Sequence, residues 1–250
     1  MARNEMVDVD GCQIYYEERG EGEPLLLLHG FTGAGSDWQH VFPAGAPDGF
    51  RAVRADLRGH GRSTNPSTSF TFRQSASDMF ALLDRIGIGR FKAIGMSAGA
   101  KTLLHMATRQ PERVDAMVLV SATPYFPAQV RAAMAQLSFD ALGAAERDAM
   151  RARHAYGDDQ IRMLFEQGRG FKDSYDDMAF TPPLLATIAA RTLVVHGDRD
   201  PFYPVEMAMA LYRAIPTSAL WVVPHGDHGP IFGKMAAPFV ETALGFLRSA

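Results

Sequence analysis

Residues 91–102 read FKAIGMSAGAKT. A short apolar run ends at Gly95, and a segment in which apolar residues recur with helical spacing begins at about Ala98. Ser97 therefore falls on a turn between a strand and a helix, within a G-x-S-x-G pattern. Small neighbours leave room for a strained backbone at the serine, and the start of a helix favours developing negative charge. The stretch predicts a nucleophilic serine on a sharp turn.

The same stretch is one substitution short of the phosphate-binding pattern G-x-x-x-x-G-K-[ST], because Ala100 stands where that loop needs a glycine. A nucleotide site of this kind also needs a Mg²⁺-binding aspartate at the end of an apolar strand. The one candidate, Asp56, follows a strand that is interrupted by Arg54. We therefore favour the nucleophile interpretation and expect Lys101 to be a residue of the helix surface.

Strand and helix patterns alternate along most of the chain. The predicted strands are 12–18, 24–29, 50–55, 91–95, 114–120, 192–196 and 220–223, and the predicted helices are 72–86, 98–109, one that ends at about 212, and 236–248. This alternation is typical of an α/β fold with a doubly wound, mostly parallel sheet. Residues 124–185 lack a strand pattern and are helical and rich in methionine and aromatic residues. We predict a core domain of residues 1–123 and 186–250, with residues 124–185 inserted as a helical cap over the carboxyl ends of the strands.

Two polar loops follow the last predicted strands and supply candidate partners for the serine. Residues 196–201 read HGDRDP and residues 224–230 read PHGDHGP. A serine nucleophile needs a base and an acid that orients the base. The histidines of the second loop and the aspartates of the first are candidates, since both loops lie at carboxyl ends of strands.

The second loop also raises the possibility of a metal site formed by His225, Asp227 and His228. Catalytic zinc needs three well-placed ligands, and the chain contains no H-x-H or H-E-x-x-H pattern. We therefore expect no metal and no organic cofactor.

Several separated motifs resemble the α/β-hydrolase superfamily, and the resemblance covers nearly the whole chain. Residues 27–31, LLHGF, look like the family's oxyanion turn, in which a hydrophobic residue follows H-G. Residues 56–63, DLRGHGRS, look like its D-x-R-G-x-G-x-S segment. Among capped members the chain looks most similar to small carboxylesterases and enol-lactone hydrolases. The resemblance implies the α/β-hydrolase fold.

The resemblance also implies roles for individual residues. Ser97 would be the nucleophile and His228 the base, in the order serine, acid, histidine that the family uses. The acid would be Asp200, which precedes x-x-x-P, whereas Asp198 would form a turn. His225 remains a competitor, but the family's spacing from Pro224 indicates His228.

Further positions follow from the same resemblance. The backbone N–H groups of Phe31 and Ala98 would form the oxyanion hole. Met96 replaces a polar or aromatic residue found in many relatives and bears on the polarity of the substrate pocket. Trp38 would lie near the mouth of that pocket. His29 and His60 would tie loops together.

Composition narrows the functional classes further. The 250 residues include 25 Lys and Arg against 28 Asp and Glu, and the net charge of -3 lacks the basic character of a nucleic-acid or anionic-membrane binder. Cys12 is the only cysteine, so no internal disulfide can form, as is usual in a reducing compartment. Residues 1–10 lack an apolar run of signal-peptide length. We expect a cytoplasmic protein.

Together these observations predict a serine hydrolase that cleaves a small carboxylic ester or lactone through an acyl-enzyme on Ser97. The serine argues against haloalkane dehalogenase or epoxide hydrolase chemistry. The resemblance implies that enzymes of this fold with either chemistry carry an aspartate at the position of Ser97. Three alternatives share the same residues: a cofactor-free haloperoxidase or perhydrolase, a carbon–carbon bond hydrolase, and a ligand receptor with slow turnover. The sequence leaves the substrate and the oligomeric state open.

Overall fold

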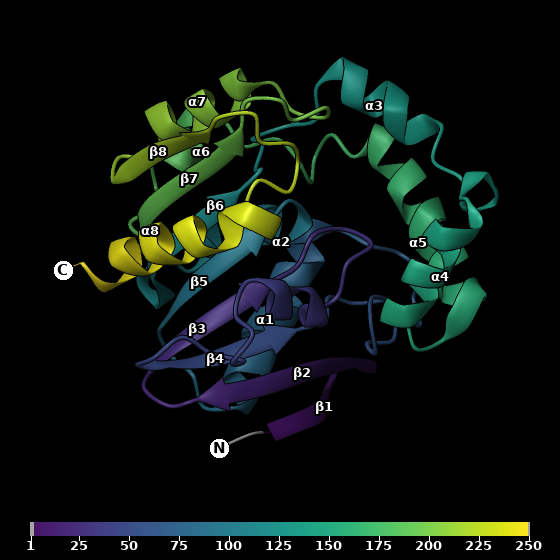
Figure 1. Ribbon diagram of the computed structural model, residues 1–250, viewed down its shortest axis with the longest axis horizontal. Coiled ribbons are helices and arrows are strands. Elements are labelled where there is room, and N and C mark those ends of the chain that lie inside the picture. Colours follow the sequence, from purple (N-terminus) through teal and green to yellow (C-terminus); the bar gives the residue numbers. More distant parts are fainter. Residues whose placement is uncertain (1–2, 250) are drawn as a thin grey trace.

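An eight-stranded sheet forms the centre of the computed structural model, which describes residues 3–249 (Figure 1). The strands are β1 (Arg3–Val9), β2 (Cys12–Gly20), β3 (Glu23–Leu28), β4 (Phe50–Ala55), β5 (Phe91–Met96), β6 (Val114–Val120), β7 (Arg191–Gly197) and β8 (Ser218–Val223). Their order across the sheet is β1-β2-β4-β3-β5-β6-β7-β8. β3 to β8 run parallel, and β2 pairs antiparallel with both β1 and β4. The predicted doubly wound, mostly parallel sheet is confirmed.

The edge strand β1 is the one strand of the eight that the sequence did not predict. It pairs with β2 along its whole length, from Arg3 opposite Glu18 to Val9 opposite Cys12. Most of its residues are exposed. An exposed edge strand lacks the apolar run that identifies a buried strand, and charged residues suit such an edge.

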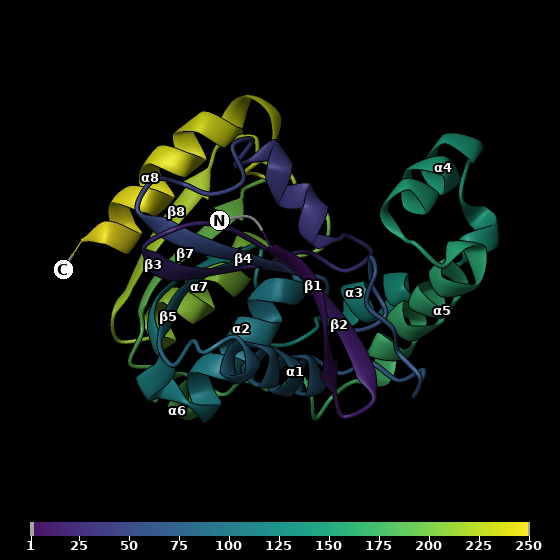
Figure 2. The ribbon, with the colours of Figure 1, turned by 90° about the horizontal axis from the view of Figure 1, so that it is seen from below.

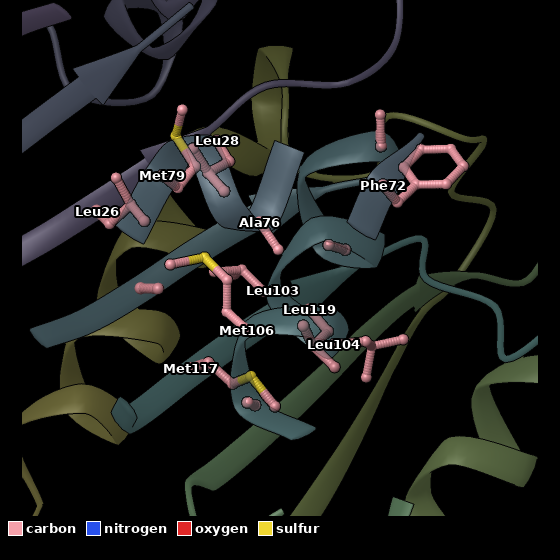
Figure 3. Packing of buried hydrophobic residues seen from close by; sticks show 14 of the residues in the cluster. Leu26, Leu28, Phe72, Ala76, Met79, Leu103, Leu104, Met106, Met117 and Leu119 are labelled. Carbon is pink, nitrogen blue, oxygen red and sulfur yellow. The ribbon is translucent and has the colours of Figure 1, made fainter. Parts of the chain in front are cut away.

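Helices cover both faces of the sheet (Figure 2). One face packs against α1 (Phe72–Arg85), α2 (Ala98–Arg109) and α7 (Val205–Ala214), and the other against α8 (Ala236–Arg248) and the short 3₁₀ helix η1 (Gly35–His40). Two further 3₁₀ helices, η2 (Pro111–Arg113) and η5 (Gly233–Met235), lie in connections. The fully buried run of β3 serves both faces: Leu26 and Leu28 pack toward α1 and α2, as Figure 3 shows, and Leu25 and Leu27 pack toward α8. Alternate side chains of a strand point to opposite faces, so a continuous apolar run is what a doubly covered sheet requires.

A helical insertion, residues 121–190, separates β6 from β7. It contains α3 (Ala128–Ala135), α4 (Ala144–Arg153), α5 (Gly157–Gly170) and α6 (Pro182–Leu185), with the 3₁₀ helices η3 (Phe139–Ala141) and η4 (Phe171–Asp173). As predicted, residues 124–185 contain no strand in the described chain. The one β-type pairing there is an isolated bridge between Tyr125 and Ala179. Figures 1 and 2 both show α3, α4 and α5 beside the sheet and away from α8. The division into a core domain and a cap of 124–185 stays a prediction.

Buried polar contacts attach the helical insertion to the loops after β3 and β4. The Gly61 N–H donates to His154 Nδ1 at 2.9 Å, and His154 Nε2 lies 3.1 Å from the Thr32 carbonyl oxygen. The first contact makes Nδ1 an acceptor, so the ring is neutral and its proton is on Nε2. Gln160 Nε2 donates to the carbonyl oxygens of Gly59 and Gly61.

This attachment predicts sensitivity to acid. Burial lowers the pKa of His154 to about 4, below the value of about 6.5 for an unfolded histidine. The unfolded chain therefore binds the proton first, and the contribution of this group to stability is lost as the pH falls from about 6.5 toward 4. We expect the free energy of unfolding to drop by about 2–3 kcal/mol between pH 7 and pH 4.5 on this account. Urea unfolding at the two pH values measures the drop.

The control for this prediction is a substitution that removes the titrating group. His154→Gln should lose clearly less stability on acidification than the parent, because glutamine binds no proton in this range. His40→Gln, at an exposed histidine, should behave like the parent. An equal pH-dependent loss in the parent and in His154→Gln would contradict the prediction.

Candidate active site

Ser97 lies on the turn between β5 and α2 in a strained conformation, with φ +48° and ψ −102°. The turn closes only because its neighbours lack side chains. A Cβ atom on Gly95 would lie 2.6 Å from the backbone of Gly99, and one on Gly99 would lie 2.3 Å from the carbonyl oxygen of Leu28. The Gly99 N–H donates to the carbonyl oxygen of His29 at 3.0 Å, which ties the turn to the loop after β3. The G-x-S-x-G pattern thus fixes the serine at the end of the central strands.

A chain of hydrogen bonds runs from Ser97 to the loop after β7. His228 Nε2 lies 2.9 Å from Ser97 Oγ, and His228 Nδ1 lies 2.7 Å from Asp200 Oδ2. The other carboxylate oxygen of Asp200 accepts the N–H groups of Phe202 and Tyr203 at 2.8 and 3.1 Å. A carboxylate at Nδ1 holds the ring proton there and leaves Nε2 free to accept the serine proton.

The protonation of Asp200 agrees with this arrangement. Its side chain is 0% exposed, and burial by itself would raise the pKa of the carboxyl. The hydrogen bond from His228 and the two backbone N–H groups outweigh burial and bring the pKa below its ordinary value. Asp200 is therefore ionised at neutral pH and suited to stabilise a positively charged imidazole.

The loops after β7 and β8 are packed backbone to backbone. A Cβ atom on Gly197 would lie 2.3 Å from the carbonyl oxygens of Gly226 and Asp227, so the two loops can approach this closely only at a glycine. The Ser121 hydroxyl donates to the carbonyl oxygen of His228 at 2.8 Å. These contacts hold the histidine at the carboxyl end of the sheet, next to Ser97.

The competing candidates lie elsewhere. Asp198 and His225 are both exposed, and within residues 3–249 neither hydrogen-bonds to Ser97 or His228. Asp227 is exposed and accepts the Gly229 N–H at 2.8 Å. Over the same residues, no group of three or more His, Cys, Asp or Glu side chains is arranged to hold a metal ion.

The backbone N–H groups of Phe31 and Ala98 have no acceptor within the described chain. Both residues line the same cavity as Ser97. The loop that carries Phe31 is held by His29, whose Nε2 accepts the Leu57 N–H at 3.0 Å and whose Nδ1 contacts the Gly30 carbonyl oxygen at 2.7 Å. Free N–H donors beside a nucleophile can stabilise an oxyanion.

The serine opens into an apolar cavity of about 360 Å³. Core residues Phe31, Phe72 and Tyr203 form part of its wall, and the helical insertion covers it. The insertion residues that line it are Phe126, Val130, Ala133, Met134, Leu137, Phe165 and Phe171. The cavity is thus built from both parts of the chain.

Lys101 is the clearest departure from the sequence analysis. We expected a residue of the helix surface, but Lys101 is 2% exposed, lines the cavity and places Nζ 3.4 Å from Ser97 Oγ. The expectation was wrong because α2 is buried on all sides from Ala98 to Ala107, whereas most helices keep one face in water. Residues four apart lie on the same helix face, which is the sequence signal that connects Lys101 to Ser97.

The two expected pocket residues line a different space. Met96 and Trp38 face a smaller cavity of about 190 Å³, which shares Phe31 and Thr32 with the larger one. Trp38 is 2% exposed and stacks on Phe42. Neither Met96 nor Trp38 is among the described residues that line the cavity containing Ser97.

The comparisons with known proteins agree with this geometry. Residues 23–153, just over half of the chain, match the family model described as alpha/beta hydrolase fold. The chain therefore belongs to the α/β-hydrolase family, which confirms the resemblance found in its motifs.

Individual relatives differ in what they do. The chain is 28% identical to 2-hydroxy-6-oxononadienedioate/2-hydroxy-6-oxononatrienedioate hydrolase 2 of Pseudomonas putida, over 94% of this chain and 92% of the relative. It is 27% identical to the non-heme chloroperoxidase CPO-A1 of Kitasatospora aureofaciens, over 88% and 90%. The solved structure of Est816, described as an N-acyl homoserine lactone degrading enzyme, is similar with a TM-score of 0.75 and 26% identity, over 97% of this chain and 100% of that one. A match to Protein PHYLLO of Arabidopsis thaliana, at 29% identity, spans only 9% of that longer protein and 65% of this chain.

Proposed function

We propose that the protein cleaves a carboxylic ester or lactone through an acyl-enzyme on Ser97. The observation that carries this proposal is the unbroken chain of hydrogen bonds from Asp200 through His228 to Ser97, at the base of an apolar cavity. Serine, histidine and aspartate in this geometry are suited to nucleophilic acyl transfer.

In the first half of the reaction, Ser97 Oγ attacks the carbonyl carbon while His228 Nε2 takes the hydroxyl proton. The carbonyl π electrons move to the oxygen, and the N–H groups of Phe31 and Ala98 stabilise that oxyanion. When the carbonyl reforms, the bond to the leaving oxygen breaks and His228 returns the proton to it. An ester releases an alcohol at this stage, whereas the hydroxyl of an opened lactone stays on the acyl group.

In the second half, water replaces the alcohol. His228 takes a proton from the water molecule as the water oxygen attacks the acyl carbon. The bond between that carbon and Ser97 Oγ then breaks, and His228 passes the proton to the serine oxygen. The products are a carboxylic acid and the free enzyme. Asp200 stabilises the imidazolium in both halves without itself taking the proton.

The helical insertion would act in this reaction as a cap that selects the substrate. Its apolar residues, among them Val130, Met134 and Leu137, face the serine across the cavity. Methionine adapts to varied shapes, so the cap would accept acyl groups of more than one shape.

Among residues 3–249, no helix has the length and apolar character needed to cross a bilayer. Cys12 is buried and unpaired, and a cytoplasmic location stays a prediction.

A second candidate function is supported by the relatives. The chloroperoxidase relative favours testing peroxide as a replacement for water in the second half of the reaction, which would yield a peracid from the acyl-enzyme. The site residues would be the same. This candidate would be favoured if the rate of peracid formation exceeded the rate of hydrolysis when water and peroxide are present at equal thermodynamic activity.

Assays with short esters and lactones, combined with active-site labelling, test the proposal. We expect repeated turnover of 4-nitrophenyl esters or of simple lactones. We also expect a serine-directed phosphonate to inactivate the protein with one label per chain, on the peptide that contains Ser97, because the activated hydroxyl attacks phosphorus as it attacks carbon. Mass spectrometry of the digested protein locates the label. A single turnover followed by tight product binding would identify a receptor, and full activity in fully labelled protein would contradict the assignment.

A further inference from the structure

Lys101 is a buried cation that the proposed reaction does not use. The only hydrogen bond of its ammonium group in the described chain is the 3.4 Å contact from Nζ to Ser97 Oγ. An ammonium group has three N–H donors, so two of them have no partner, although the residue is only 2% exposed. Its side chain lines the cavity that contains Ser97. An unpartnered donor in such a place is costly unless a ligand satisfies it.

The surroundings of Nζ are aromatic. The ring centres of Tyr203, Phe126 and Phe72 lie 4.9, 5.6 and 5.7 Å from it. Ring faces attract a cation but cannot accept its hydrogen bonds as an oxygen does. No carboxylate within residues 3–249 forms a salt bridge with Lys101; the nearby charge of Asp200 is already engaged by His228.

The cavity offers no internal counter-charge. Apart from His228, Lys101 is the only side chain among the described lining residues that can carry a charge at neutral pH, and no acidic residue is among them. An anionic ligand would thus meet one cation and no repelling carboxylate in the wall. The rest of the wall would contact the apolar part of the same ligand.

We propose that Lys101 binds a carboxylate of the substrate, so that the preferred ester or lactone carries a free carboxylate on its acyl part, close to the carbonyl that Ser97 attacks. This inference rests on the proposed function. Proximity follows from the 3.4 Å between Nζ and Ser97 Oγ, because a carboxylate bound at Nζ would lie close to the carbonyl that Oγ attacks. Charge-assisted hydrogen bonds between an ammonium group and a carboxylate are among the stronger polar contacts.

One further observation favours an anion-binding role over a role as base. His228 Nε2 lies at 2.9 Å from Ser97 Oγ and already takes the position that a base needs, whereas Nζ is at 3.4 Å. Burial lowers the pKa of Lys101 to about 7 against the opposing effect of Asp200. A bound carboxylate would favour the charged form of Lys101 and raise its pKa again.

A selectivity measurement tests the proposal. The substrates are 4-nitrophenyl hemiglutarate, which carries a carboxylate, and its neutral methyl ester. In Lys101→Met the ratio of kcat/KM for the anionic over the neutral substrate should fall by about 10–100-fold relative to the parent, the range expected for one hydrogen bond to a charged group. Lys101→Arg, which keeps the charge, should recover part of the ratio. Lys234→Met, which removes an exposed lysine, should leave the ratio unchanged.

The pH dependence of the same ratio gives a second readout. In the parent, the ratio should fall as the pH rises from 6 to 8, because Lys101 loses its charge. The other titratable groups that face Lys101 are Asp200, His228 and Tyr203, and all three remain in Lys101→Met. The difference between the two profiles is therefore due to Lys101.

A binding experiment separates failure of this inference from failure of the proposed function. In a Ser97→Ala background no turnover is needed, and calorimetry measures the Kd of glutarate at pH 6.5. We expect Lys101→Met to raise this Kd at least tenfold, even if the protein hydrolyses no ester. Thermal midpoints verify folding, and Lys101→Gln replaces Lys101→Met should the latter be unfolded. An unchanged ratio with an unchanged Kd, or an equal loss for both substrates, would overturn the proposal; the second result would indicate that Lys101 serves Ser97 instead.

Discussion

Replacing Ser97 by alanine should lower kcat for any ester substrate by about 10⁴–10⁶-fold and leave the fold intact. The substitution removes the oxygen that would form the acyl-enzyme and leaves the rest of the site in place. Stability should change little, because alanine has the same backbone cost as serine at φ +48° and only the contacts to His228 and Lys101 are lost. Steady-state kinetics and a thermal midpoint, measured on the same preparation, test both parts.

The matched control for this prediction is Ser75→Ala in α1. Ser75 is fully buried, and its hydroxyl has no hydrogen-bond partner within the described chain. Its removal should leave kcat unchanged and keep or raise the thermal midpoint, because an unsatisfied buried hydroxyl is lost. Activity of Ser97→Ala within tenfold of the parent, in protein free of contaminating hydrolase, would refute the nucleophile assignment.

The second large effect is expected for Asp200→Asn, with kcat about 10⁴-fold lower. The amide oxygen can still accept the N–H groups of Phe202 and Tyr203, as Oδ1 does now. The amide NH₂ would then replace the oxygen that lies 2.7 Å from His228 Nδ1. A donor at that position forces the ring proton onto Nε2, where it faces Ser97 and prevents proton transfer. Kinetics and thermal melting of the variant measure the two effects separately.

Asp198→Asn is the control from the same loop. The Asp198 side chain is exposed, and its backbone N–H donates to the Val223 carbonyl oxygen at 3.3 Å, a contact that asparagine retains. Activity should stay within a few-fold of the parent. If Asp198→Asn instead proved the more damaging at unchanged stability, the acid would be misassigned, while the pairing of Ser97 with His228 would be unaffected.

The parts of the molecule that follow local rules were predictable from the sequence. Seven of the eight strands follow from apolar runs or from alternating apolar and polar residues, and parallel strands bring their carboxyl ends to one edge of the sheet. Ser97, Asp200 and His228 follow three such strand ends, so the sequence alone predicts that they lie close together. Their chemical roles stay predictions until the substitutions are made.

The residues whose positions were predicted wrongly have a common cause. Whether a side chain is buried, and which cavity it lines, depends on contacts with residues distant in sequence. Lys101 was expected at the surface because the chain around it does not reveal that aromatic residues from α1, from the segment after β6 and from the loop after β7 enclose it. Met96 was expected in the substrate pocket because it precedes Ser97, and Trp38 was expected near the mouth of that pocket, as Phe31 is. The structure places them in a separate, smaller cavity.

The isolated bridge between Tyr125 and Ala179 has a consequence for how this fold can diversify. It joins the beginning of the helical insertion to the segment just before α6, and the Phe180 N–H donates to the Pro124 carbonyl oxygen at 3.0 Å beside it. A segment whose ends are already joined can be exchanged as a cassette, because the strands on either side need not move to receive a replacement. Replacing residues 126–178 by the corresponding segment of another member of the family would change the part of the cavity wall that the insertion supplies. The Ser97 turn and the loops of Asp200 and His228 lie outside the transplanted stretch and would be inherited unaltered.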